Sequence, residues 1–262
     1  MTGFVDLYTE SDTFLHRMDP RVKIVAVLLL SLLALILSSL TSLVILLAFV
    51  FLLLFLARAS LSKTMFALKF VLRLMVLIVI LWPFFDPHGT PVLLSLGPLK
   101  ITQPAIFKGL ASAARVGCLA CVWYILMFTT SQRNLVLALV KLGLRFDFGL
   151  TVAISLRFFP TFVSTIDSVM DAQKARGMEF SKGGLLRRSK KYVAVLVPAV
   201  VSALRMADSL SLALQSRAYG ARHDRTYLRD LRMRGSDYVA LAITLFVLLA
   251  SVVAKFAYAV HL

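Results

Sequence analysis

Long apolar runs separated by short polar breaks dominate the chain. Residues 24–57 are almost wholly apolar and are interrupted only by a polar patch at 38–42, which is typical of a turn between two helices. Each of these helices has about 16 residues, which is short for a hydrocarbon core of roughly 30 Å. Further apolar runs cover residues 65–82, 106–128 and 238–260. The pattern predicts an all-α polytopic membrane protein with about five transmembrane helices.

Residues 83–105 break the pattern between the third and fourth predicted spans. Five of the eight prolines of the chain fall in this stretch, together with Gly89 and Gly97. Proline and glycine interrupt helices and favour turns. We therefore expect a loop here, with a short re-entrant or strand-like piece at 91–101.

Residues 131–236 differ in kind from the apolar runs on either side. Apolar side chains recur at helical spacing over 148–176 and again over 189–217. Arg205 and Asp208 lie near the middle of the second stretch, and charged side chains are costly at the centre of a bilayer. We therefore expect two long amphipathic helices, the second of which lies under the membrane rather than across it.

The charge of the chain indicates which side of the membrane each segment occupies. The 262 residues are 60% hydrophobic and only 16% charged, with a net charge of +16. Segment 131–236 carries 18 basic and 7 acidic residues, so most of the excess lies there. Because cytoplasmic segments of membrane proteins are enriched in Lys and Arg, this segment is predicted to be cytoplasmic. The N-terminus is then inside, and the 38–42 turn, the 83–105 loop and the C-terminus are outside.

These assignments predict three parts in the chain. Residues 1–130 form a membrane domain with the N-terminal segment and four spans, 131–236 form a cytoplasmic domain of long amphipathic helices, and 237–262 form the final transmembrane helix. The protein is expected to be a multi-pass protein of the cell membrane, with the lipid bilayer as its solvent.

The two amphipathic stretches end in the same way. The segment from Asp167 to Gly177 aligns without gaps to the segment from Asp208 to Ala218, with an arginine between small residues near the end of each. The candidate site residues are Ala175, Arg176, Gly177, Ser216, Arg217 and Ala218. A cation at a helix C-terminus can simply complement the macrodipole, for roughly 0.3–1 kcal/mol. Alternatively, small neighbours let a partner approach, and the guanidinium fork can pair bidentately with a carboxylate.

Other motifs that carry chemistry are missing from the sequence. There is no G-x-x-x-x-G-K-[ST] stretch for a nucleotide, no H-E-x-x-H and no G-x-S-x-G, and the four histidines are scattered. Cys118 and Cys121 have the spacing of a redox pair but lie inside an apolar run, so we interpret them as packed helix residues. We expect no catalytic residue, no cofactor and no metal site.

The residues described above resemble a known family. The stretch Phe14–Lys23 looks like the opening of the T components of energy-coupling factor (ECF) transporters, the CbiQ/EcfT-like family. Ala175-Arg176-Gly177 and Ser216-Arg217-Ala218 look like the two signature triplets of these proteins, and the second departs conservatively from the usual Ala-Arg-Gly at both flanks. The order of spans, the long insert and the final span also match, so the resemblance covers the whole chain.

The resemblance implies a role in transport. Such proteins are non-catalytic membrane subunits that join two cytoplasmic ATP-binding cassette ATPases to a small substrate-binding membrane subunit. Each arginine triplet would insert into a groove on one ATPase, and the helices that carry the triplets would transmit ATPase closure. The uptake is of vitamins or transition-metal ions, and no nucleic acid is involved.

Three alternatives stay open at this stage. Within the family, the chain could be a shared T component or one dedicated to cobalt, nickel or biotin. A stand-alone permease would need a polar path through the spans, whereas the ionisable residues there are basic and mostly lie toward span ends. A membrane-embedded enzyme would need a cluster of His, Asp, Glu or Ser at one depth, which the sequence does not suggest.

Overall fold

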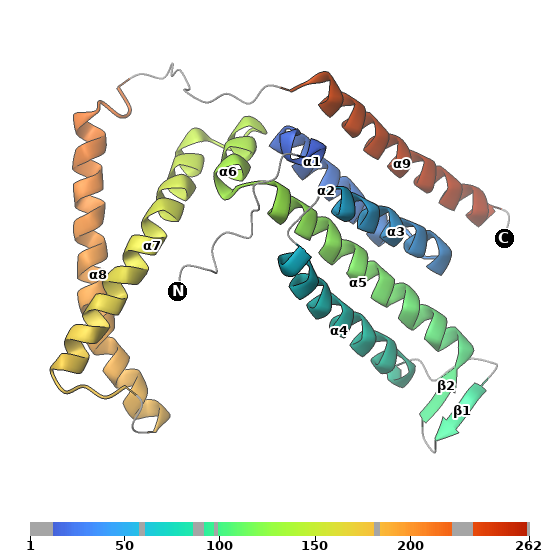
Figure 1. The fold of residues 1–262 in the computed structure, drawn as a ribbon, viewed down its shortest axis with the longest axis horizontal. Coiled ribbons are helices and arrows are strands. Elements are labelled where there is room, and N and C mark those ends of the chain that lie inside the picture. Colours follow the sequence, from blue (N-terminus) through green and yellow to red (C-terminus); the bar gives the residue numbers. More distant parts are fainter. Residues whose placement is uncertain are drawn as a thin grey trace. The chain divides into compact units, whose positions relative to one another are not determined.

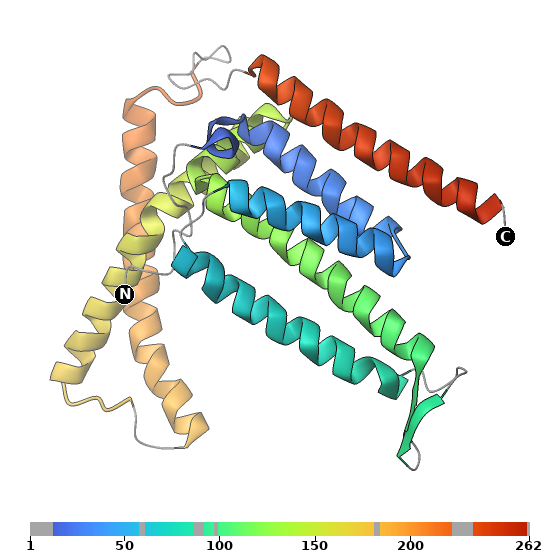
Figure 2. The ribbon, with the colours of Figure 1, turned by 45° about the vertical axis from the view of Figure 1, so that its right-hand side comes forward.

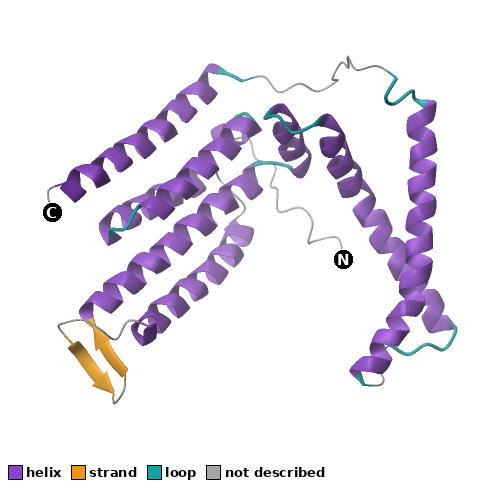
Figure 3. Cartoon of the chain, turned by 180° about the vertical axis from the view of Figure 1, so that it is seen from behind, coloured by secondary structure: helices purple, strands orange, loops and turns teal. Residues whose placement is uncertain are grey.

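The computed structural model describes residues 13–57, 61–85, 92–96, 99–180, 184–221 and 233–260. Apart from one short hairpin, the elements in these ranges are helices (Figures 1 and 3). The chain divides into two compact units, one of Met1–Gly143 with Leu231–Leu262 and the other of Leu144–Asp230. Residues 1–12 and the basic stretch at 222–232, which entered the topology prediction, lie outside the described residues.

The first unit contains one helix for each predicted span. These helices are α2 (Pro20–Ile36), α3 (Leu40–Leu56), α4 (Leu61–Phe85), α5 (Gln103–Thr129) and α9 (Gly235–Val260). Helices α2 and α3 have 17 residues each, so each rises only about 26 Å. The prediction of an all-helical polytopic protein with about five spans is confirmed.

Length and composition also single out helices of the second unit. Among the described residues, the helices long and apolar enough to cross a membrane are α5, Phe146–Ala175, Lys191–Ser216 and Gly235–Val253, and Leu40–Leu56 is a shorter apolar helix. About 44% of the α5 window is buried, whereas only 6% of the Gly235–Val253 window is. Helix α5 is therefore the centre of the first unit, while α9 presents most of its apolar surface outward, as a lipid-facing helix does.

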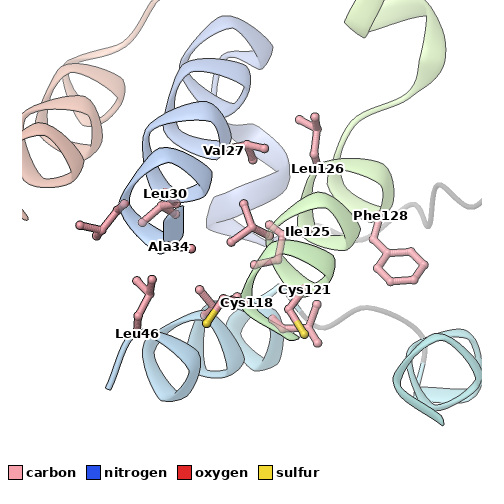
Figure 4. Packing of buried hydrophobic residues seen from close by; sticks show 13 residues of the cluster. Val27, Leu30, Ala34, Leu46, Cys118, Cys121, Ile125, Leu126 and Phe128 are labelled. Atoms are coloured by element: carbon pink, nitrogen blue, oxygen red, sulfur yellow. The ribbon is translucent and has the colours of Figure 1, made fainter. Parts of the chain in front are cut away.

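Helices α2, α3 and α5 enclose the main hydrophobic core. Figure 4 shows side chains from the three helices pointing toward one another, including Leu30 of α2, Leu46 of α3 and Ile125 of α5. Cys118 and Cys121 are buried free thiols in this cluster, which confirms their interpretation as packed helix residues. The core thus centres on the face of α5 that carries the two cysteines.

Glycines let α4 lie close to α5. A Cβ at Gly117 would meet the Met75 sulfur at 2.9 Å, and a Cβ at Gly109 would meet the Trp82 Cβ at 3.0 Å. Both distances are tighter than ordinary van der Waals contact. Small residues at such positions allow membrane helices to pack closely.

Helices α2 and α5 cap each other's C-termini. The Lys23 ammonium of α2 donates to the Thr129 carbonyl at 2.9 Å, where α5 ends. At the opposite end, the Arg115 guanidinium of α5 donates from Nε to the Ala34 carbonyl at 3.2 Å and from Nη2 to the Leu37 carbonyl at 2.8 Å. The last carbonyls of a helix have no partner within it, and a cation there also complements the helix dipole.

A buried polar cluster joins α9 to the start of α2. Asp19, Lys23 and Asp237 are only 5%, 6% and 1% exposed. The backbone N–H groups of Asp19 and Arg234 donate to the two carboxylate oxygens of Asp237, at 3.2 and 2.8 Å. The end of the N-terminal stretch 14–23, which carried part of the family resemblance, therefore holds the first and last spans together.

Some boundaries differ from the sequence prediction. The break between α2 and α3 covers 37–39 rather than 38–42, because Ser39 is the N-cap of α3 and accepts the Ser42 N–H at 3.4 Å. Strands β1 (Val92–Leu96) and β2 (Leu99–Thr102) pair antiparallel and confirm the expected strand-like piece. The sequence analysis missed the short helix α1 (Phe14–Arg17) and also α6 (Gln132–Lys141), which packs against α2.

The second unit consists of two long helices, α7 (Phe146–Ala175) and α8 (Leu185–Ser216), which confirm the predicted helices at 148–176 and 189–217. They run antiparallel (Figure 2). Near the end of α7, the Gln173 side chain donates to the Ala194 carbonyl of α8 at 3.4 Å, and Phe180 lies against Tyr192 with ring centroids 5.6 Å apart. The C-termini of α7 and α8 therefore lie at opposite ends of the pair.

Candidate functional site: two matched helix ends

Both candidate arginines occupy the same position in their helices. Helix α7 ends at Ala175 and Arg176 is its C-cap, with φ −81° and ψ 11°. Helix α8 ends at Ser216 and Arg217 is its C-cap, with φ −94° and ψ 16°. The gap-free match in the sequence therefore reflects a match in backbone geometry.

The first helix end is a Schellman motif. The Gly177 N–H donates to the Lys174 carbonyl at 2.9 Å, and the Met178 N–H donates to the Gln173 carbonyl at 3.0 Å. These two bonds satisfy carbonyls that the helix leaves without partners. The motif requires a left-handed residue directly after the C-cap, and Gly177 supplies it with φ +87°.

The second helix end repeats both hydrogen bonds. The Ala218 N–H donates to the Gln215 carbonyl at 2.9 Å, and the Tyr219 N–H donates to the Leu214 carbonyl at 3.0 Å. Ala218 takes the place of Gly177, with φ +54°. Among the residues that the structure describes, it is the one non-glycine residue with a positive φ. A left-handed conformation costs an alanine roughly 1–2 kcal/mol. The motif at the second end is thus kept at the expense of local backbone strain.

Both guanidinium groups face solvent. Arg176 and Arg217 are exposed, and so are the small residues on either side of each. In the described part of the chain, neither arginine has a hydrogen bond or an ion pair through its side chain. By contrast, Lys174 pairs with Asp171 at 2.8 Å on the same turn of α7. Each arginine can therefore offer its full fork of donors to a carboxylate on another molecule.

The two arginines lie far apart on the helix pair. Arg176 follows the end of α7, which contacts α8 near Ala194. Arg217 lies 23 residues beyond Ala194, which is about 35 Å along an α-helix. One small protein surface cannot bind both arginines in the same pocket, so the pair offers two separate sites.

Sequence analysis missed a contact that positions the second helix end. The Tyr219 hydroxyl donates to the Asp147 carboxylate at 2.8 Å and so ties the last residue of the Schellman motif to the first turn of α7. These residues are 72 positions apart, so the signal in the sequence is weak. Asp147 also approaches Arg145 at 3.9 Å, but both side chains are largely exposed, which makes this ion pair weak.

The rest of the described structure offers no obvious catalytic chemistry. No group of three or more His, Cys, Asp or Glu residues that could hold a metal ion occurs among the described residues. The thiols of Cys118 and Cys121 lie buried among apolar side chains. The two helix ends therefore remain the candidate site, and their exposed guanidinium groups suit recognition of a carboxylate.

Comparison with known proteins identifies the family of this chain. The family model CbiQ, described as cobalt transport protein, matches residues 11–228. The energy-coupling factor transporter transmembrane protein EcfT of Brevibacillus brevis is 31% identical over 250 residues, which cover 92% of this chain and 94% of that protein. The EcfT proteins of Streptococcus equi subsp. equi and Thermosediminibacter oceani are 32% and 30% identical, and the matches cover 92% and 95% of this chain and 92% and 96% of those proteins.

The matched region includes predicted membrane spans as well as the C-terminal ends of α7 and α8. The family model covers α2 to α8 together with both arginine triplets, and the alignments to the EcfT proteins run over nearly the full length of each partner. The expected family and the expected class, a multi-pass membrane component of a transporter, are thereby confirmed. This chain belongs to the CbiQ/EcfT family of transmembrane components of energy-coupling factor transporters.

Proposed function

We propose that this chain couples two ATP-binding cassette ATPases to a substrate-binding membrane subunit, with Arg176 and Arg217 as the contacts to the two ATPases. The observation that carries the proposal is the pair of Schellman motifs, each of which presents an exposed arginine between small residues. A helix-dipole role alone explains a cation near each end. It does not explain why small residues flank the arginine on both sides at each end.

The separation of the arginines supports two ATPase contacts rather than one. Two arginines about 35 Å apart along the helix axis, each at the tip of its helix, fit two subunits that each have their own groove. Because α7 and α8 are packed together, a displacement of one tip acts on the other through the helix pair. Closure of the two ATPases on ATP then changes the arrangement of α7 and α8, and that movement reaches the substrate-binding subunit.

The proposal places the coupling helices in the cytoplasm. We assign residues 1–130 and 237–262 to the membrane domain and the final span, and 131–236 to the cytoplasmic coupling domain. The 18 basic residues of that segment favour the cytoplasmic side. ATP hydrolysis belongs to the partner subunits, so the purified chain by itself should hydrolyse no nucleotide.

The transported substrate is a vitamin or a transition-metal ion. The family model's description names cobalt, whereas the names of the similar EcfT proteins name no substrate. A shared T component and one dedicated to cobalt, nickel or biotin are both compatible with the two helix ends. Affinity purification in mild detergent distinguishes them, because a dedicated component retains one substrate-binding subunit and a shared one retains several.

The docking assignment is tested with arginine variants of the complete transporter. If each arginine pairs with a partly buried carboxylate, removing one should cost about 2–5 kcal/mol of binding free energy. Arg176→Ala or Arg217→Ala alone leaves one tip bound, whereas the double variant loses the avidity of linked contacts. We expect the double variant to lose ATPase pull-down and substrate uptake.

Matched controls come from the same helices. Arg157 of α7 and Arg205 of α8 are also exposed but lie away from the ends. The double variant Arg157→Ala and Arg205→Ala removes the same charge and should assemble and transport normally. If the double variant Arg176→Ala and Arg217→Ala assembles and transports at parental levels, the two arginines only complement the helix dipoles and do not bind the ATPases.

A further inference from the structure

Helix α8 has a gap in its backbone hydrogen bonds where it packs against α7. Pro198 lies inside α8 and has no N–H group, so the Ala194 carbonyl, four residues earlier, lacks its normal helical donor. The neighbouring residues Val195 and Ala199 are only 4% and 2% exposed, and α7 is the helix that packs against α8. The gap therefore lies in the packed part of the pair, where a carbonyl needs a replacement donor.

Gln173 of α7 fills this gap. Its side-chain amide donates to the Ala194 carbonyl at 3.4 Å, and both residues are partly buried. The helix pair contains a second proline gap, because Pro160 of α7 leaves the Leu156 carbonyl without its helical donor. Among the described residues, no side chain donates to that carbonyl. The Gln173 contact is thus specific to the gap in α8 and is not shared by both prolines.

The same glutamine belongs to the Schellman motif that presents Arg176. Its backbone carbonyl accepts the Met178 N–H at 3.0 Å, while its side chain binds α8. Arg176 lies three residues after Gln173, at the end of α7. Four residues further on, the Phe180 ring lies against Tyr192 of α8, with the ring centroids 5.6 Å apart. Contacts to α8 therefore flank Arg176 on both sides in the sequence.

The second helix end is held in a different way. In the gap-free match between the two ends, Leu214 stands where the first end has Gln173, and its side chain has no donor. The second end is tied to α7 through Tyr219 and Asp147 instead. The Schellman motif forms at both ends, so the motif does not account for a glutamine at position 173.

We propose that Gln173 is a positioning residue that transmits the movement of Arg176 to α8 at the proline gap. This proposal rests on the coupling function proposed above. Sharp bends in helices occur at prolines, where one backbone hydrogen bond is missing. Gln173 holds the carbonyl at the edge of that gap. A force on Arg176 therefore changes the bend of α8 and does not only shift the helix pair as a rigid body.

The first test is a thermodynamic cycle on the purified, complete chain. Gln173→Met keeps the length and helix propensity of the side chain but removes its N–H donors. It should lower the midpoint of thermal unfolding by about 2–4 °C, the shift that corresponds to one lost hydrogen bond. In the Pro198→Ala background a backbone N–H binds the Ala194 carbonyl, so the same exchange should lower the midpoint much less.

Pro160→Ala provides the matched control. It restores the helical donor of the Leu156 carbonyl, which Gln173 does not bind, so Gln173→Met should have its full effect in this background. Equal effects of Gln173→Met in the parental, Pro198→Ala and Pro160→Ala chains would show that Gln173 does not serve the gap in α8. No ATPase takes part in this test, so its result is independent of the docking assignment.

The second test measures coupling in the complete transporter. Gln173→Met should retain pull-down of both ATPases, because both arginines are still present. Uptake per ATP hydrolysed should fall roughly fivefold, the factor that the loss of one average hydrogen bond removes from an equilibrium. The control is Gln103→Met, the same exchange at an exposed position of α5, and it should leave both quantities at parental levels.

The outcomes separate this proposal from the docking assignment. Parental uptake per ATP in Gln173→Met would overturn the positioning role, whereas the docking of Arg176 and Arg217 would still be decided by their own variants. Loss of ATPase pull-down in Gln173→Met would also overturn it, because Gln173 would then maintain the docking surface and not transmit its movement. A fall in uptake per ATP with normal pull-down is the result that the positioning role requires.

Discussion

The left-handed residue after each arginine shows how tightly backbone geometry limits the two helix ends. Gly177 adopts φ +87° at no steric cost, whereas Ala218 adopts φ +54° with strain. A built Cβ at Gly177 meets nothing within 4 Å, so space is not the constraint there. The constraint is the sign of φ, which a side chain resists even in open solvent.

We predict that Ala218→Gly stabilises the protein. Glycine removes the left-handed strain, so the free energy of unfolding should rise by roughly 1 kcal/mol. The same exchange at Ala213, an exposed position inside α8, should lower it by about 0.5–1 kcal/mol, because glycine weakens a helix interior. Thermal unfolding of the purified variants measures both. Changes of equal sign at the two positions would contradict the strain at Ala218.

We predict that Ala175→Trp blocks the first ATPase contact. Ala175 is exposed in the last helical turn, so a large ring there hinders a partner but leaves Arg176 and the left-handed Gly177 in place. Pull-down of the ATPases should fall, and uptake should fall further. Ala153→Trp is the control, since Ala153 is exposed on α7 far from its end. Normal assembly of Ala175→Trp would rule out close approach at this tip.

At the level of elements, two cations on facing helices set the pairing of α2 and α5. Lys23 binds the end of α5, and Arg115 binds the end of α2. Sequence analysis found the helices because apolar runs of helical length are a strong signal. It could not find these caps, because the two groups in each contact are far apart in the chain, by 106 and 78 positions, and meet only after folding.

We predict that Lys23→Met is strongly destabilising. The charges of Asp237 and Asp19 act on the buried Lys23, so its removal leaves carboxylates buried without their cation. The Lys23 ammonium also donates to the His16 and Thr129 carbonyls, and leaving such buried acceptors without a donor costs about 1–3 kcal/mol. Replacing Lys23 and Asp237 together should cost less than the sum of the single changes. Thermal unfolding provides the values, and strict additivity would show that the two charges do not interact.

Lys69→Met provides the comparison for that experiment. Lys69 lies exposed on α4, where a surface substitution changes the free energy of unfolding by no more than about 0.5 kcal/mol. The contrast separates burial of the charge from the general effect of losing a lysine. A similar loss at both positions would mean that the cluster of Asp19, Lys23 and Asp237 contributes little.

At the level of the whole molecule, the arrangement of helix ends agrees with alternating spans. A chain that crosses a bilayer repeatedly brings alternate helix ends to the same side. In that arrangement one side holds the start of α2, the end of α3, the start of α4 and the end of α5. The charge of the 131–236 segment predicts that this segment lies on the cytoplasmic side. Helices α7 and α8 are long and apolar enough to span a membrane as well, so their placement needs a direct test.

We predict that α7 is accessible to water from the cytoplasm and that the α2–α3 turn is accessible from outside. The native Cys118 and Cys121 are buried, so the labelling background is low. In intact cells, Thr41→Cys should react with a membrane-impermeant maleimide. Arg157→Cys should react only after the cells are permeabilised. Failure of Arg157→Cys to react from either side would place α7 within the lipid, and reaction in intact cells would invert the topology.

The two matched helix ends were more predictable from the sequence than the contacts around them. The triplets at 175–177 and 216–218 were visible as a repeated pattern, because each lies within one helix and its stop signal. The Schellman hydrogen bonds explain that pattern. The contact of Tyr219 with Asp147 and the cluster around Asp237 were not predictable. They join segments that are far apart in the chain, and no repeated pattern in the sequence indicates that these segments meet. Helix α6 was missed because its ten residues make a weak signal beside longer apolar runs.

The hydrogen bond between Asp19 and Asp237 has a consequence for synthesis of the protein. The two residues are 218 positions apart, so a ribosome that adds about 5–20 residues per second makes the second one roughly 10–40 s after the first. During that interval the nascent chain has inserted its first helix with a buried lysine that lacks one of its carboxylates. A chain that stalls before α9 keeps this defect permanently. The unfinished product therefore differs from the finished one at its very beginning, where Asp237 would otherwise accept the Asp19 N–H.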